Sequence, residues 1–167
     1  MKKRRAKKKQ SKYKVSVLLT SFAFVIVASF LGSLFTSSSV NSSWYQSIKP
    51  AITPPNWVFP IAWTILFGLI ALSMFLGLSN SKPKDKGKIL NLFIINLMLN
   101  VLWSVFFFGL KDVTVAFICL IALWISILVM IAGLLKVSRP AAYMLIPYYL
   151  WVTFAGILNY LAMIKLM

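Results

Sequence analysis

WYQSIKPAITPPNWVFPIAW, residues 44–63, lies between two long apolar runs and holds three of the chain's six tryptophans and four of its seven prolines. Prolines cannot continue a helix, and they bias the residues before them toward extended backbone. We therefore expect a stiff, aromatic-rich loop that leads into a helix beginning between Trp57 and Pro60, because proline is tolerated in a first helical turn. Amphipathic aromatic rings are favoured at a membrane–water boundary, where their polar edge can contact water, and we expect three residues there: Trp44, Tyr45 and Trp57.

The composition indicates that lipid is part of this protein's solvent. Of 167 residues, 60% are hydrophobic and 12% are charged, and the mean hydropathy is +0.88. The charged share is about half the average of soluble domains. Too little polar surface remains to cover a soluble fold, so we expect one integral membrane domain.

Five apolar runs are long enough to cross about 30 Å of hydrocarbon as helices. They are predicted at 15–35, 57–79, 89–108, 114–136 and 140–165. The expected fold is an all-α integral membrane protein, a five-transmembrane-helix bundle over residues 15–167, in which short connections place consecutive helices antiparallel. Pro147 removes the hydrogen bond to the carbonyl of Tyr143 and is expected to kink the last helix.

A basic segment, MKKRRAKKKQSKYK at 1–14, precedes the first run and carries nine of the eighteen cations. A basic stretch before an apolar run also describes a signal peptide, but this run exceeds the usual length of about 7–15 residues and no A-x-A site follows, so we expect a retained helix. We expect the segment to be a tail, disordered at the membrane surface, that either fixes orientation alone or also binds anionic lipid. Apart from Tyr13 it has no stacking aromatics, which argues against nucleic acid as a partner.

The distribution of all eighteen cations predicts the orientation. Fifteen cations fall on the side of the N-terminus, and the opposite side has three: Lys49, Lys111 and Lys165. Because cytoplasmic loops carry an excess of Lys and Arg, the N-terminus is predicted in the cytoplasm and the C-terminus outside. The expected location is a bacterial plasma membrane, with the proline-rich loop on the outer face.

The titratable residues exclude several kinds of active site. The chain has no histidine, its acids are Asp85 and Asp112 in short loops, and its one cysteine is Cys119. No carboxylate pair, His-based triad or cysteine–histidine metal site can be built from these residues, so we expect no metal and no required cofactor. The interior of the predicted spans contains no charged residue, which argues against ion-coupled transport.

Three predicted spans carry aromatic and polar residues at helical spacing. Asn96 and Asn100 are one turn apart, and an unpaired amide in hydrocarbon is costly, so both are expected to face protein. They either form interhelical hydrogen bonds or line a cavity and orient the polar edge of a ligand. Nearby tryptophan rings suit a planar apolar ligand. We call each set of such residues a stripe. The stripe of span 57–79 contains Trp63 and Phe67, and that of span 89–108 contains Asn96, Asn100 and Trp103, beside Ser104. The stripe of span 140–165 contains Trp151, Phe154, Ala155 and Leu158, before Asn159.

These stripes belong to longer motifs that resemble those of a known protein family. W-Y-x-x-I-K-P-x-x-x-P-P-x-W-V-F-x-x-x-W-x-x-L-F, from residue 44, is similar to the signature of the TspO/translocator-protein (TspO/MBR) family, the tryptophan-rich sensory proteins. LMLNVLWSVFFFG (97–109) and LIPYYLWVTFAGILNY (145–160) resemble the third- and fifth-helix motifs of that family. The resemblance covers residues 44–160 in the correct order. The basic tail lies outside it, and Asn96 stands where many members have glutamine.

The resemblance implies a five-helix bundle, commonly a homodimer, that binds porphyrins and other apolar ring ligands below the loop between the first two helices. A porphyrin or haem-type tetrapyrrole is then the implied ligand and not a cofactor. Ala28 and Gly32, four apart on the first helix, would allow close approach either in a dimer or inside the monomer. The implied ligand-facing residues are Trp63, Phe67, Asn96, Asn100, Trp103, Trp151 and Ala155. The implied lid comprises Trp44, Lys49, Pro50, Pro54 and Pro55.

Three functions fit this resemblance. The leading one is a membrane receptor or sensor-regulator that binds tetrapyrroles in an intramembrane pocket lined by tryptophan and asparagine. The second is a light-dependent porphyrin-degrading enzyme, in which Trp63 and Trp151 would take part in place of an acid–base pair. The third is a facilitative transporter of porphyrins or other apolar metabolites.

Overall fold

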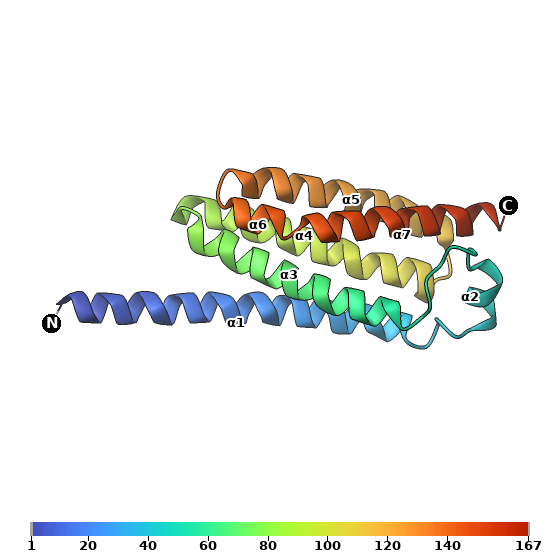
Figure 1. Cartoon of the computed structure of the whole chain (residues 1–167), viewed down its shortest axis with the longest axis horizontal. Coiled ribbons are helices and arrows are strands. Elements are labelled where there is room, and N and C mark those ends of the chain that lie inside the picture. The colour runs from blue at the N-terminus through green and yellow to red at the C-terminus, as the bar shows by residue number, and fades with distance from the viewer. Residues whose placement is uncertain (1, 167) are drawn as a thin grey trace.

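The computed structural model describes the backbone of residues 2–166 and the side chains from Tyr13 to Leu166. This range contains helices and no strand, and five helical segments are long and apolar enough to cross a membrane, as predicted (Figure 1). The spans lie in α1 (Lys2–Thr36), α3 (Val58–Asn80), α4 (Lys86–Ser104), α5 (Val113–Leu135) and the pair α6 (Arg139–Tyr143) and α7 (Ile146–Ile164).

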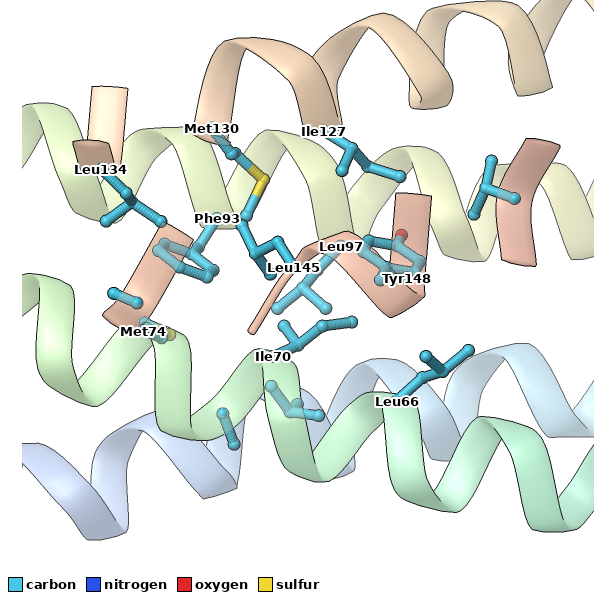
Figure 2. Packing of buried hydrophobic residues seen from close by; sticks show 14 of the residues in the cluster. Leu66, Ile70, Met74, Phe93, Leu97, Ile127, Met130, Leu134, Leu145 and Tyr148 are labelled. Atoms are coloured by element: carbon cyan, nitrogen blue, oxygen red, sulfur yellow. The ribbon is translucent and has the colours of Figure 1, made fainter. Parts of the chain in front are cut away.

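The core lies between α3, α4, α5 and the α6–α7 pair. The α4 span is the most enclosed, since 39% of its most apolar segment is buried. In the α1 span only 17% of the corresponding segment is buried, because α1 packs on α3 and α4 from one side. Figure 2 shows side chains of all these core helices meeting in one cluster. Its largest buried members include Ile70 and Met74 of α3, Phe93 of α4, Ile127, Met130 and Leu134 of α5, and Leu145 and Tyr148 of the last span.

The outer surface of the bundle is apolar on every span. One large aliphatic side chain from each span is 59–65% exposed: Leu19, Ile65, Met98, Ile118 and Leu150. A soluble monomer does not expose apolar residues over its whole circumference, whereas hydrocarbon covers them without cost. The protein is therefore an integral membrane protein.

The expectation of a disordered N-terminal tail is wrong. Helix α1 begins at Lys2 and runs into the first span, so that it extends beyond the other helices (Figure 1). Residues 2–14 contain neither glycine nor proline and are mostly Lys, Arg, Ala and Gln, which have high helix propensity, and the membrane span supplies the helical nucleus. Lys86 of α4 donates a hydrogen bond to the Tyr13 hydroxyl and places its ammonium 4.4 Å from the ring centroid, which ties α1 to α4.

Small residues on α1 serve packing inside the monomer. Ala28 is 7% exposed, and a Cβ added at Gly32 would lie 3.4 Å from Ser104 Oγ of α4. This close approach uses the stripe of Ala28 and Gly32 within one chain. The predicted homodimer needs another surface and stays a prediction.

The proline-rich loop contains a short helix that the proline pattern does not predict. Helix α2 (Ser43–Ile48) begins after Ser42, whose Oγ accepts a hydrogen bond from the backbone N–H of Tyr45 at 3.2 Å. No proline falls within α2, and the serine supplies an N-cap, so a short helix can form before the first proline. The chain then continues to the start of α3 at Val58, within the predicted interval, and Trp57 is 65% exposed.

The end of α4 is widened into a π-helix that was also not predicted. The α-helix ends at Ser104, and the π-helix η2 (Val105–Gly109) follows, with the Leu110 N–H donating to the Val105 carbonyl at 2.8 Å. The wider turn buries two adjacent rings, Phe107 and Phe108. A single π-turn inside a helix is frequent at functional sites.

The last span is broken where Pro147 predicts a kink. Helix α6 ends at Tyr143 and α7 begins at Ile146, so the single helix expected over 140–165 is wrong. Pro147 lies in the first turn of α7 and has no N–H to continue the helical bonding from α6. The break places Leu145 and Tyr148 in the core, where neither is exposed.

Candidate functional site

A chain of hydrogen bonds joins α4, α5 and α7 in the core. The Asn100 side-chain amide donates to the Tyr148 hydroxyl, and that hydroxyl donates to Asn96 Oδ1, each at 3.2 Å. Asn96 Nδ2 donates to Ser126 Oγ at 2.8 Å, and Ser126 donates to the Leu123 carbonyl at 2.7 Å. We call the four side chains Asn96, Asn100, Ser126 and Tyr148 the amide network.

The asparagines of the amide network are shielded from both water and lipid. Asn96 and Tyr148 are 0% exposed, and Asn100 is 6% exposed. Each amide donates to a side chain of another helix, so the interhelical hydrogen bonds considered for this pair are formed. Direct contact of either amide with a ligand stays a prediction.

Aromatic rings of α3 and α7 lie beside the amide network. The ring centroids of Trp63 and Tyr148 are 6.2 Å apart, edge to face, and those of Trp63 and Phe67 are 5.2 Å apart. One turn earlier on α3, Phe59 meets Trp151 edge to face at 5.9 Å. The four rings Phe59, Trp63, Phe67 and Trp151 are half-buried, and we call them the aromatic wall. A ring with one face partly open can stack on a planar ligand.

Trp103 lies in a different aromatic cluster, next to α2. Its indole N–H donates to Asn159 Oδ1 at 3.0 Å, and its ring stacks on Phe107 with centroids 5.3 Å apart. Trp44 of α2 packs edge to face on the same Phe107 at 5.8 Å. Asn159 Nδ2 donates to the Val113 carbonyl at 2.9 Å, which pairs both polar atoms of this amide. Trp103 is thus bonded to α7 and is linked to α2 through Phe107.

Polar contacts fasten the predicted lid at its edges. Lys49 Nζ donates to Asn56 Oδ1 at 3.0 Å, and Asn56 Nδ2 donates to Asn41 Oδ1 at 3.3 Å. Lys165, just after α7, donates from Nζ to the Lys49 carbonyl at 3.3 Å. Tyr45 lies beneath these contacts, and burial raises the pKa of its hydroxyl above the ordinary value. The loop is thus closed by hydrogen bonds that water can reach.

The structure brings most of the predicted site residues together and separates others. Those that meet in the aromatic wall and the amide network are Trp63, Phe67, Trp151, Asn96 and Asn100. Ala155, one turn after Trp151, and Trp103 are both half-buried against the same core, and Trp103 also stacks on Phe107, which contacts α2. Of the predicted lid residues, Pro55 is exposed and the other four are half-buried: Trp44, Lys49, Pro50 and Pro54.

Two hollows on the described surface lie away from these residues. One, of about 360 Å³, runs between α5 and α7 and is lined by Trp124 and Gly156 among others. The second, of about 410 Å³, lies at the start of α5 beside Lys111. The predicted ligand-facing residues line neither hollow, because their side chains are buried or half-buried in the core between α3, α4 and α7. A ligand in that place has to part the rings of the aromatic wall.

Tyr148 and Ser126 are members of the site that were not predicted. Tyr148 stands next to Tyr149 after Pro147, and the sequence does not tell which of two adjacent tyrosines turns inward. Ser126 lies in an apolar run, where a serine usually bonds its own helix. The one available signal for both is that two buried amides require partners on facing helices.

The chain matches the model of the TspO/MBR family over residues 21–164. It is 35% identical to the tryptophan-rich protein TspO of Chlorobaculum tepidum, over 87% of this chain and 93% of that protein. It is 38% identical to the tryptophan-rich protein TspO of Archaeoglobus fulgidus over 86% and 92% of the two chains, and 31% identical to the translocator protein of Bos taurus over 78% and 79%. The matched region contains the amide network, the aromatic wall and α2, and the chain belongs to the TspO/MBR family.

Proposed function

We propose that this protein is a membrane receptor or sensor-regulator that binds a porphyrin-type tetrapyrrole, or a similar apolar ring compound, between α3, α4 and α7. The observation that carries the proposal is the half-buried aromatic wall set directly on the amide network. The flat rings offer stacking area to a planar ligand. The hydrogen bonds behind them hold α4, α5 and α7 in place, which keeps the ring positions defined.

The relatives support this kind of role through their names. A relative from Cereibacter sphaeroides, 31% identical over 72% of this chain, is called a tryptophan-rich sensory protein, and the bovine relative is called a translocator protein. Both names fit a protein that holds a small molecule reversibly. The rings of the aromatic wall are half-buried and would part to admit such a ligand.

The orientation in this proposal places the lid outside the cell. Fifteen of the eighteen cations lie at the end opposite α2, and cytoplasmic ends carry the excess of Lys and Arg. The cations of α1 nearest the span then lie beside the anionic lipid of the cytoplasmic leaflet, where each cation near the surface contributes about 1 kcal/mol. Ligand would reach the aromatic wall from the outer face, by opening the lid.

Titration of the protein in nanodiscs with protoporphyrin IX, followed by porphyrin absorbance, tests the proposal. We expect saturable binding that is about fivefold weaker in the Trp63→Phe/Trp151→Phe variant, since each smaller ring loses part of a stacking contact. Trp124→Phe is the matched control, because Trp124 lines the groove between α5 and α7, and it should keep the affinity of the wild type. Unchanged affinity in the double variant would contradict a site at the aromatic wall.

A further inference from the structure

The two hollows on the described surface follow one seam, where α5 and α7 pack side by side (Figure 1). The deeper hollow is lined by Phe117, Ile121 and Trp124 of α5, among others. The hollow at the end of the bundle is lined by Thr114 of α5 and Met163 of α7, together with the residues just before α5. Steps of three or four residues from Thr114 to Trp124 place these α5 residues on one face of the helix. The two hollows therefore lie end to end, and together we call them the seam groove.

The seam groove has the length of one leaflet of a bilayer. It ends at Trp124, the middle residue of α5, whose ring packs on that of Tyr149 with the centroids 5.1 Å apart. The Trp124 indole N–H also donates to Thr153 Oγ1 at 2.9 Å, so two contacts between α5 and α7 close the groove there. From Thr114 to Trp124 the helix rises by about 15 Å. This rise is half of the hydrocarbon thickness of about 30 Å.

The deeper part of the seam groove offers mainly apolar contacts. Two of its lining residues, Leu120 and Val152, are buried. A Cβ added at Gly156 would lie 3.2 Å from Leu120 Cδ2, so the glycine leaves room that a side chain would fill. The Thr153 hydroxyl accepts the indole N–H and donates to the Tyr149 carbonyl at 2.8 Å, which satisfies it within the protein. A lining of this kind suits a hydrocarbon chain, which gains dispersion contacts and needs no polar partner.

Two opposite charges line the mouth of the seam groove, Lys111 and Asp112. The Lys111 ammonium lies 5.8 Å from the Trp44 ring centroid, near the outer limit of about 6 Å for a cation–π contact, and so keeps donors for another partner. Asp112 uses Oδ1 to cap α5, accepting from the Val115 N–H at 2.9 Å, and a carboxylate has a second oxygen that can accept. A cation and an anion in one hollow complement a headgroup that carries both a phosphate and an ammonium.

We propose that the seam groove binds one phospholipid of the phosphatidylethanolamine type, from the leaflet at the α2 end of the bundle. Its phosphate lies at Lys111, its ammonium at Asp112, and one acyl chain follows α5 and α7 as far as Trp124. A lipid supplies the polar and the apolar half of this site in one molecule. The inference is independent of the proposed function, because no residue of the aromatic wall or the amide network lines the groove.

Native mass spectrometry of the full-length protein, stripped of lipid in a non-ionic detergent and titrated with dioleoyl lipids, tests the proposal. We expect one equivalent of dioleoylphosphatidylethanolamine to bind. Dioleoylphosphatidylglycerol, which lacks the ammonium, should bind about threefold more weakly, as the loss of one partly exposed ion pair would give. Dioleoylglycerol, which lacks the phosphate as well, should bind about tenfold more weakly than phosphatidylethanolamine.

Variants of the mouth test the headgroup contacts. Lys111→Gln should reduce the preference for phosphatidylethanolamine over dioleoylglycerol by about threefold. Its matched control is Lys84→Gln, an exposed lysine at the opposite end, which should keep that preference. Asp112→Asn retains an oxygen that can cap α5 and removes the charge, so it should abolish the preference over phosphatidylglycerol alone.

Variants that fill the deeper part test the acyl chain. Ile121→Trp places a larger ring in the groove and should weaken binding of all three lipids about tenfold, because the chain loses its packing. Ile118→Trp makes the same change at an exposed position on another face of α5 and should keep the affinity. Gly156→Leu fills the groove from α7 and should act like Ile121→Trp, which separates filling from a local effect of the indole. Thermal unfolding of the lipid-free variants shows that each is folded.

Three outcomes would overturn the inference. Equal affinity of the wild type for the three lipids would show that the mouth does not read the headgroup. Equal affinity of Ile121→Trp and Ile118→Trp would show that no acyl chain lies in the groove. A lipid-free dimer of the wild type that Ile121→Trp dissociates would assign the groove to a second copy of the chain. None of these results bears on the porphyrin titration, which tests a different part of the molecule.

Discussion

Two pairs of asparagines join segments of this protein, and the two pairs differ in how far they are buried. Asn96 and Asn100 are 0% and 6% exposed and are both bonded to Tyr148. In the lid, Asn41 is exposed and Asn56 is half-buried, and these two bond to each other at 3.3 Å. A buried amide that loses its partner stays unpaired, whereas an exposed one is rehydrated at once. The hydrogen bonds of the lid can therefore break at lower cost than those of the amide network.

This inequality separates two roles. The amide network fixes α4, α5 and α7 against one another and so holds the aromatic wall in position. In the proposed function, the lid governs how readily a ligand reaches that wall. Substitutions in the two pairs should accordingly change different observables, the free energy of unfolding for the buried pair and the opening rate for the lid.

The largest effect is expected from Asn96→Ala. This change leaves the Tyr148 hydroxyl without its acceptor and opens a small cavity, so we expect a loss of about 2 kcal/mol in the free energy of unfolding. Thermal unfolding in nanodiscs measures it, with Asn91→Ala, an exposed amide on the same helix, as the control. Equal effects of the two substitutions would show that the buried pair carries no special stability.

A smaller effect is expected from Tyr148→Phe, which keeps the ring that faces Trp63 and removes only the hydroxyl. The hydroxyl links both amides, so its loss should cost about 1 kcal/mol of stability while affinity for porphyrin stays near that of the wild type. Tyr149→Phe, at the next position, is the control for the substitution itself. A large loss of affinity with no loss of stability would place the hydroxyl in contact with ligand and contradict its structural role.

The smallest change in stability is expected from Asn56→Ala in the lid. Water replaces the lost bonds to Lys49 and Asn41, so the free energy of unfolding should change by less than about 0.5 kcal/mol. Amide hydrogen exchange in residues 43–57 should nevertheless become faster, because less holds the loop closed. Asn80→Ala, which removes an exposed amide bond at the other end of α3, should leave that exchange unchanged. Unaltered exchange in Asn56→Ala would mean that the lid is held by its apolar contacts instead.

The membrane fold could be predicted from the sequence because its signals are local. Apolar runs of sufficient length, Pro147 and the start of α3 near Pro60 depend on residues that are neighbours in the chain. The π-helix η2 depends on tertiary contacts, because Phe107 and Phe108 are buried against Trp44 and Tyr45. The signal for α2 is one serine N-cap, Ser42, which is weak beside the prolines that follow. The continuous helix of α1 departs from the expected disorder because the helix propensity of its residues and the adjoining span outweigh the repulsion among its cations.

The candidate site was predictable in part for the same reason. Asn96 and Asn100 identify a polar face within one helix, but their partners lie 52 and 48 residues away at Tyr148. Trp103 shares that face by helical spacing, yet its indole donates to Asn159 of α7, 56 residues away, and its ring stacks on Phe107. The helical period predicts on which face of a helix a residue lies, but its hydrogen-bond partner is known only from the packing of the helices.

Fluorine NMR of protein labelled with 5-fluorotryptophan tests the central claim most directly, because the six tryptophans give six signals distributed over the molecule. The claim is that a porphyrin lies against the aromatic wall, and the ring current of a macrocycle shifts the signals of the residues that it covers. We predict large shifts for Trp63 and Trp151 on addition of protoporphyrin IX, and none for Trp124 in the groove between α5 and α7. A spectrum in which Trp124 shifts while Trp63 and Trp151 do not would contradict the proposed site.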